Sequence, residues 1–287
     1  MNTIAVITRT KNRPYFLNRV LEHLLKQSFK EFTWVIVNDA GDRKIPDVCC
    51  EVARKNNLDA NVIHLTKALG RAGAANEGVE NSNEPFIHIH DDDDTLEPRF
   101  YEKMVSILKK NSAAVASTCG VTRIVEYEKK ANWHTKTKTK LDLANSPLPI
   151  FDLAYENKIT TIGTLFRRVH FDTIGGFDRS LPVLEDWDLW LRLIQIGDFL
   201  LHPEYLANYH IRPVGKDKGM DDVANSKLSQ HIQVERQIRN KYLRDDLKSG
   251  AMGMGWALNL HHRQTLNRLD ALLARLSGIK NRFTGGG

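Results

Sequence analysis

Cysteine is scarce in this sequence, and long apolar runs are absent. The three cysteines, Cys49, Cys50 and Cys119, are an odd number without the spacing of a metal site, which is typical of proteins from a reducing cytosol. The first residues lack the basic segment of a signal peptide, and no apolar stretch approaches the roughly 18 residues of a membrane span. We therefore expect a cytoplasmic protein.

Several common nucleotide-binding and nucleic-acid-binding patterns are missing as well. No G-x-G-x-x-G follows the first expected strand, which argues against a dinucleotide-binding turn, and there is no P-loop lysine motif. The sequence has no arginine-rich run and no interleaving of basic and aromatic residues, so we expect no nucleic-acid partner. The share of charged residues, 26%, is that of an ordinary globular protein.

Four consecutive aspartates at 91–94 are the most distinctive feature that is present. They follow 86–90, which reads as a buried strand, and Pro98 behind them is placed to open a helix. Four adjacent carboxylates repel one another, and a divalent cation with oxygen ligands would offset that repulsion. Ligands of open α/β sheets bind beyond the carboxyl ends of the strands, so the run predicts a metal site for an anionic, phosphorylated ligand. The alternative is an acidic surface turn.

Strands and helices alternate through the first 118 residues. This alternation predicts a mostly parallel sheet with helices on both faces. Right-handed crossovers would bring the strand ends at 8–13, 39 and 91–94 to one edge of the sheet. The expected strands are 4–7, 32–37, 61–65, 86–90 and 114–118, and the expected helices are 14–25, 45–56, 72–80 and 98–110.

The pattern changes after about residue 121. The lysine-rich segment 123–140 indicates either hairpin strands or a mobile loop, and further strands are expected at 160–166 and 205–212. A helix with acidic residues in its first turn begins near Leu184, where those acids suit the helix dipole. From about residue 222 the chain is expected to be helical.

Leucine and isoleucine recur at helical spacing between 266 and 279, with arginine and lysine around them. Such a helix either packs on the domain or a partner subunit, or lies on a membrane surface. The sequence therefore predicts a homo-oligomer contact or a peripheral membrane contact through the C-terminal helices, and leaves the choice open.

Ordered motifs lie between residues 4 and 212. They are Thr8-Arg9-Thr10-x-Asn12-Arg13, Val35-Ile36-Val37-Asn38-Asp39-Ala40-Gly41, Asp91-x-Asp93-Asp94-x-x-x-Pro98, Gly175-Gly176-Phe177-Asp178 and Glu185-Asp186-Trp187-Asp188-Leu189-Trp190-x-Arg192. Together these motifs resemble those of the family 2 glycosyltransferases. The chain departs from the family pattern at Asn38, where an acid is usual, and at 209–212, where Tyr-His-Ile-Arg replaces Tyr-Arg-x-His. The resemblance implies a GT-A fold, which is a Rossmann-like, mostly parallel sheet flanked by helices, and inverting transfer of a sugar assisted by Mn²⁺ or Mg²⁺.

On this resemblance we expect a glycosyltransferase domain at 1–215, with a nucleotide-sugar-binding half at 1–118 and an acceptor half at 119–215. A helical extension at 216–287 follows. The expected donor is a UDP-sugar. The expected acceptor is a growing surface glycan of the O-antigen or capsule type, or its lipid-linked form, at the inner face of the membrane.

The resemblance assigns the nucleoside part of the donor to the first strand ends. Asp39 would accept the imide N–H of uracil, because an ionised carboxylate is an acceptor only. Thr8 and Thr10 would line the base or ribose pocket. Asp91 and Asp92 would reach the ribose or the outer shell of the metal.

The diphosphate and the metal are assigned to neighbouring residues. Arg13 and Arg71 would bind phosphate, because a guanidinium can fork onto phosphate oxygens, and Gly70 belongs to the turn that positions Arg71. Surface arginines are the alternative. Asp93 would be the direct metal ligand and His210 would complete the ligand set, with a structural or acceptor-binding His210 as the other interpretation.

Asp186 is the expected general base, since inverting transfer needs a carboxylate that takes the proton of the acceptor hydroxyl. Repulsion from Glu185 would raise its pKa. Both acids could instead only stabilise the helix start, and Asp188 is the second candidate for the base. Trp187 and Trp190 are expected to pack in the core.

Three other functions remain to be compared with this one. A sugar nucleotidyltransferase would normally carry a glycine-rich basic loop after the first strand, and no glycine occurs there. An inactive nucleotide-sugar-binding module of a larger assembly would bind without turnover. A nucleic-acid binder would show steep salt dependence.

Overall fold

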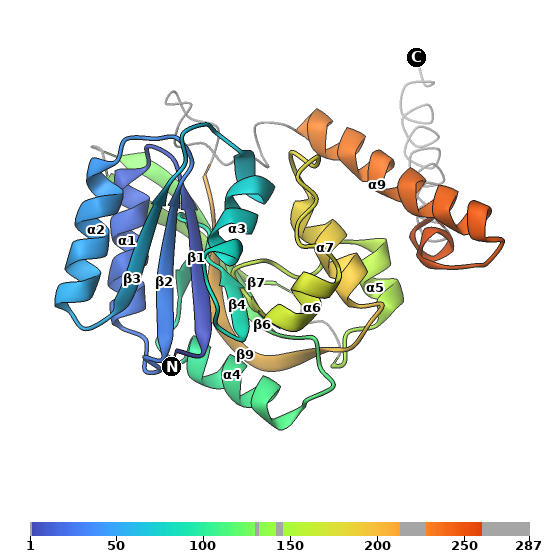
Figure 1. The fold of residues 1–287 in the computed structure, drawn as a ribbon, viewed down its shortest axis with the longest axis horizontal. Coiled ribbons are helices and arrows are strands. Elements are labelled where there is room, and N and C mark those ends of the chain that lie inside the picture. The colour runs from blue at the N-terminus through green and yellow to red at the C-terminus, as the bar shows by residue number, and fades with distance from the viewer. Residues whose placement is uncertain (1, 130–131, 142–145, 213–227, 260–287) are drawn as a thin grey trace, which may run out of the picture.

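The computed structural model of the protein, which describes residues 2–129, 132–141, 146–212 and 228–259, is built on one nine-stranded sheet (Figure 1). Its first four strands are parallel and lie in the order β3 (Asp59–His64), β2 (Phe32–Asn38), β1 (Ile4–Thr10) and β4 (Phe86–Ile89). Every residue of β1, β2 and β4 is buried, as the continuous apolar runs predict for strands covered on both faces.

Antiparallel pairs extend the same sheet. Beyond β4 follow β8 (Thr164–Arg167), β6 (Ala116–Lys129), β9 (Phe199–Ile211) and β5 (Thr95–Leu96). The pairs β4–β8, β6–β8 and β5–β9 are antiparallel, and β6–β9 is parallel. Because the sheet is continuous from β3 to β5, the two predicted halves of the domain share one sheet.

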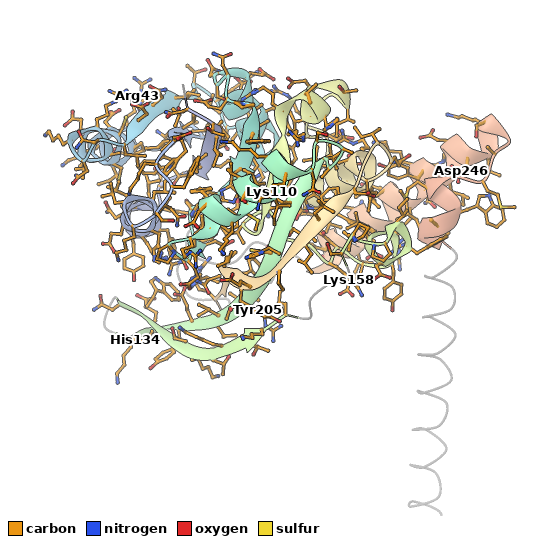
Figure 2. The ribbon with its side chains drawn as sticks, turned by 90° about the horizontal axis from the view of Figure 1, so that it is seen from below. Arg43, Lys110, His134, Lys158, Tyr205 and Asp246 are labelled. Carbon is orange, nitrogen blue, oxygen red and sulfur yellow. The ribbon has the colours of Figure 1, made fainter. Side chains whose placement is uncertain are left out.

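The lysine-rich segment forms a hairpin rather than a loop. Strand β7 (Asn132–Lys140) pairs with the far end of β6, beyond the part of β6 that pairs with β8. Figure 2 shows this hairpin, with His134 labelled, projecting from the body of the protein.

Helices cover both faces of the sheet and enclose a core on each side. One core contains buried residues of α1 (Pro14–Leu25), α2 (Lys44–Lys55) and α4 (Phe100–Lys110). The other core contains residues of α3 (Gly70–Glu80), α5 (Ile150–Tyr155), α6 (Arg168–Thr173), α7 (Glu185–Leu193) and α9 (Leu228–Ser249). The predicted mixed fold with a mostly parallel N-terminal sheet is therefore confirmed.

Two details differ from the sequence interpretation. Thr95 and Leu96, which precede the helix expected to open at Pro98, form the short strand β5, which pairs with β9. Helix α4 then starts at Phe100 and not at Pro98. The boundary placed at 215 separates α9 from the domain, yet Val234 and Ile238 of α9 belong to the same core as α5 and α7. None of the described helices combines the length and apolar character needed to cross a bilayer. The apolar stripe at 266–279 lies outside the described residues.

Candidate active site

The carboxyl ends of β1, β2 and β4 meet at one edge of the sheet and border a cavity of about 180 Å³. Backbone hydrogen bonds hold this edge together: the amide of Asp39 donates to the carbonyl of Thr10, and that of His90 donates to the carbonyl of Ile7. The cavity brings together nine of the twelve predicted site residues: Thr10, Arg13, Asp39, Gly70, Arg71, Asp91, Asp92, Asp93 and His210.

Asp39 holds the start of α3 against the end of β2. Its Oδ1 accepts a hydrogen bond from the backbone amide of Leu69 at 2.6 Å, and its Oδ2 accepts one from Gly70 at 3.1 Å. Gly70 has a φ of +73°, a conformation that glycine adopts without strain. The Asp39 carboxylate thus satisfies amides at a helix start and still borders the cavity.

Guanidinium groups neutralise the aspartate run. Arg13 bridges two of its members, with Nη1 2.6 Å from Asp92 and Nη2 2.8 Å from Asp93. The hydroxyl of Thr10 donates to the other oxygen of Asp92 at 2.8 Å. Arg212 pairs with the same Oδ2 of Asp93 that Arg13 contacts. Although burial opposes ionisation, Arg13 and Arg212 hold the pKa of Asp93 well below its usual range.

Asp91 lies between two further arginines. It pairs with Arg9 through Oδ1 and with Nη2 of Arg71 through Oδ2 at 3.3 Å, and Thr161 donates to Oδ2 at 3.2 Å. Both arginines also bind Glu185, at 3.2 Å from Arg9 and 3.0 Å from Arg71. The acidic run is therefore a network of ion pairs that reaches α7, and it is not the acidic surface turn considered above.

His210 borders the cavity, and other side chains of the protein hold its ring. Its Nε2 lies 2.9 Å from the hydroxyl of Thr95, and its Nδ1 lies 2.9 Å from Glu126. Both ring nitrogens thus have protein partners in this structure. Among the residues that are described, no three His, Cys, Asp or Glu side chains converge as metal ligands.

Asp93 offers a carboxylate oxygen to a metal that is bound together with a ligand. It lines the cavity, and its Oδ1 takes part in neither of its two ion pairs. Mg²⁺ is usually held by one or two carboxylates, with substrate phosphates and water completing the shell. The chemistry of the donor set therefore suits a cation that arrives with a diphosphate.

The two acidic residues at the start of α7, Glu185 and Asp186, lie in different environments. Glu185 is 1% exposed and is held by Arg9 and Arg71. Asp186 accepts hydrogen bonds from the backbone amide of Trp187 at 2.8 Å and from Nδ2 of Asn157 at 3.1 Å. Burial and the charge of Glu185 raise the pKa of Asp186 to about 6. A carboxylate with that pKa is suited to accept a proton near neutral pH.

Two predicted residues take structural roles instead. Thr8 is fully buried, and its hydroxyl accepts a hydrogen bond from Nε1 of Trp34, so it lies in the core and not along the cavity. Asp188, the second candidate for the base, is fully buried between Arg192 at 2.8 Å and Lys241 at 3.4 Å. Neither side chain is available to a substrate in this arrangement.

The predicted core positions of two tryptophans are confirmed. Trp187 and Trp190 are 2% and 0% exposed. His88 and His90 are fully buried, and burial lowers their pKa values to about 3 and about 4. Nδ1 of His88 lies 3.0 Å from the hydroxyl of Tyr101.

The sequence interpretation left several residues of this network without a role. Arg9 follows the expected strand 4–7, and the structure places it inside β1 as a buried cation. Arg212 lies two positions after His210, so both project to one side of the extended chain. Arg212 lies 4.6 Å from the ring centre of Phe16, and Glu126 pairs with it from β6. No local pattern marks Glu126, because its importance comes from strand pairing.

Comparison with known proteins identifies the family. The model of the family described as "Glycosyl transferase family 2" matches residues 5–173. The chain belongs to glycosyl transferase family 2. The protein is therefore a glycosyltransferase, and the described motifs at 8–13, 35–41 and 91–98 lie within the matched part.

Curated relatives agree with this family. The chain is 29% identical over 189 residues to the uncharacterized glycosyltransferase YwdF of Bacillus subtilis, covering 66% of this chain and 67% of the relative. It is 26% identical over 241 residues to the amylovoran biosynthesis glycosyltransferase AmsE of Erwinia amylovora, covering 83% and 84%.

Solved structures share the GT-A fold of this glycosyltransferase. S. aureus TarS superposes with a TM-score of 0.60 at 15% identity, over 84% of this chain and 40% of that chain. The mannosyltransferase PcManGT from Pyrobaculum calidifontis, solved with GDP-Man and Mn²⁺, gives a TM-score of 0.61 at 16% identity, over 96% and 79%. The chain thus spans less than half of TarS.

Proposed function

We propose that this glycosyltransferase moves a sugar from a UDP-sugar to a hydroxyl group of a growing glycan, with inversion at the anomeric carbon. The observation that carries the proposal is Asp186, a carboxylate with a raised pKa next to Glu185, which Arg71 connects to the cavity. In this proposal the site combines a general base, Asp186, with the arginines and aspartates that line the cavity.

The donor nucleotide occupies the cavity in this proposal. Asp39 accepts the imide N–H of uracil, and Thr10, Asp91 and Asp92 lie along the ribose. A structure of TarS contains UDP-GlcNAc, whereas PcManGT contains GDP-Man, so neighbours of this fold bind either base. A carboxylate at Asp39 can accept an N–H from either base, and nucleotide titration distinguishes the two.

The diphosphate lies against Arg13 and Arg71 in this proposal. Both guanidiniums are present at the cavity in ion pairs with aspartates, and a phosphate oxygen competes for them as a charge-assisted acceptor. Asp93 would hold Mn²⁺ or Mg²⁺, and the cation would supply Lewis-acid stabilisation of the charge on the leaving diphosphate.

Asp186 is the general base. The acceptor oxygen bonds to the anomeric carbon while the bond from that carbon to the phosphate oxygen breaks, and the acceptor proton passes to the carboxylate of Asp186. Glu185 keeps the pKa of Asp186 high through like charge, and it holds Arg71. The Oδ1 of Asn157 is buried without a partner among the described residues, and in this proposal it accepts a hydrogen bond from the acceptor hydroxyl.

The acceptor is a surface polysaccharide or a lipid-linked precursor in this proposal. The support is the role of AmsE in amylovoran biosynthesis, together with a match that covers most of both chains. The enzyme would act in the cytoplasm at the inner face of the membrane. Its three cysteines are free and buried, which suits a reducing compartment.

The competing function is an inactive nucleotide-sugar-binding module. Calorimetric titration of UDP, TDP, GDP and CDP, each with Mn²⁺ and with EDTA, identifies the nucleotide. Release of that nucleotide from its sugar conjugates then tests turnover. We expect metal-dependent binding of UDP at micromolar concentration and measurable release. Binding without release from any conjugate would favour the inactive module, and binding of no nucleotide would overturn the proposal.

A further inference from the structure

Arg239 of α9 is a buried cation that touches two separate elements of the acceptor side. It is 4% exposed. Its Nη2 donates to the carbonyl of Tyr155 at 3.2 Å, and its Nη1 donates to the carbonyls of Ala154, at 3.5 Å, and Leu258. Its guanidinium lies 5.1 Å from the ring centre of Trp187.

These contacts satisfy backbone carbonyls at the C-terminal end of α5. The last carbonyls of a helix have no partner inside it, and side chains or water must satisfy them. In α5 the carbonyl of Leu153 accepts Nε1 of Trp187 at 2.8 Å, and the next two carbonyls accept Arg239. Arg239 and Trp187 thus together hold the C-terminal end of α5 in place.

That point lies two residues before Asn157, which donates to Asp186. Trp187, whose ring packs on Arg239, is the residue directly after Asp186 and donates its backbone amide to that carboxylate. Both hydrogen bonds received by the Asp186 carboxylate therefore come from segments that Arg239 holds.

We propose that α9 forms part of the acceptor side of the active site and that Arg239 is a positioning residue, which orients Asp186 through Asn157 and Trp187. This inference rests on the proposed role of Asp186 as the base. Further contacts tie the same two helices together: Lys241 and Tyr242 of α9 lie 3.4 Å and 3.5 Å from Asp188 of α7.

The matched test compares Arg239→Lys with Arg236→Lys. Lysine keeps the charge but offers one flexible ammonium in place of a planar fork, so it cannot hold two carbonyls and lie flat on the indole at once. Arg236 lies three residues earlier on α9 and is exposed, with no hydrogen bond or ion pair to the described residues. The two variants therefore differ in the contacts removed and not in the chemistry of the change.

Hydrogen–deuterium exchange of the unliganded protein is the first readout, and it needs no substrate. We expect Arg239→Lys to raise exchange at least fivefold in peptides covering 154–160 and 185–188. Peptides covering 4–13 and 86–96 should be unchanged. Arg236→Lys should change neither region. Unchanged exchange at 154–160 in Arg239→Lys, or an increase throughout the chain, would overturn the proposal.

Kinetic measurements distinguish a residue that orients Asp186 for catalysis from one that only stabilises the local fold. Nucleotide release is measured from UDP-N-acetylglucosamine or GDP-mannose, whichever the wild type hydrolyses faster, across pH 5–9. We expect Arg239→Lys and Asn157→Ala each to lower kcat about tenfold, with nucleotide affinity within twofold of wild type, and to move the acidic limb of the profile to higher pH. Because both act through one carboxylate, the double variant should be no slower than the worse single one.

Additive losses in the double variant, or a matching loss of nucleotide affinity, would contradict the positioning role. If Asp186→Asn retains full turnover, the proposed base fails. If Asp186→Asn is inactive while Arg239→Lys is as active as wild type, only the inference about Arg239 fails. If neither donor is hydrolysed, the exchange data decide whether α9 holds the two segments.

Discussion

Replacing Asp186 with asparagine is expected to stop sugar transfer and, at the same time, to stabilise the fold at neutral pH. Burial and the charge of Glu185 raise the pKa of Asp186 from 3.8 to about 6 in the folded protein. Because this pKa is higher than in the unfolded chain, ionising Asp186 is harder in the folded state. The folded state is therefore penalised fully above about pH 6, and the penalty fades as the pH falls toward 4.

The size of the gain follows from that pKa. A rise from 3.8 to about 6 corresponds to about 3 kcal/mol, and the partial exposure of Asp186 reduces the expected gain to about 1–3 kcal/mol. Asparagine can keep both contacts, because its Oδ1 can accept the Trp187 amide and its Nδ2 can donate to Oδ1 of Asn157 once that amide rotates.

Urea unfolding at pH 8 and pH 4.5 measures the effect. We expect Asp186→Asn to exceed the wild type in free energy of unfolding at pH 8 and to exceed it by only about a third as much at pH 4.5, while transfer at pH 8 falls by about 10²–10⁴-fold. Asp172→Asn, at an exposed aspartate, is the control and should change neither quantity. An Asp186→Asn protein that gains no stability at pH 8, or that still transfers sugar at the wild-type rate, would refute the reasoning.

Two further predictions concern the donor. Asp93→Ala should remove the difference in UDP affinity between Mn²⁺ and EDTA in a calorimetric titration, and a variant that keeps this difference would show that another residue holds the cation. Asp39→Asn should weaken UDP binding about tenfold, through loss of a charged hydrogen-bond acceptor, and should leave the Mn²⁺ response intact. Asp42→Asn, on the same loop and exposed, is its control, and equal affinities of the two variants would exclude Asp39 as the base contact.

Most of the sheet could be predicted from the sequence because local residue patterns indicate its strands. The runs at 4–7 and 32–37 are apolar at nearly every position, the run at 86–90 is apolar at 86, 87 and 89, and each is followed by polar residues. A short stretch such as Thr95-Leu96 carries no such signal. It becomes a strand because β9 pairs with it, and β9 follows more than 100 residues later.

The candidate site divides in the same way. Asp39 and the aspartate run follow strands directly, so their place at one sheet edge follows from parallel order. Thr8 could not be separated from Thr10 by pattern, since both have the same alternation along β1. Only packing shows that Trp34 takes the hydroxyl of Thr8, whereas Thr10, at the strand end, reaches Asp92.

The sequence by itself determined the alternating α/β order, the family motifs and the residue types available at the strand ends, because each of these depends on neighbours a few positions apart. Tertiary structure decided which charges meet. Arg9 and Glu185 are separated by 176 positions and share one hydrogen bond. Ion pairs of this kind need both partners to be delivered by different elements and to be removed from water together, and no local pattern encodes that. The same holds for Arg239, which joins α9 to the acceptor side only through the folded core.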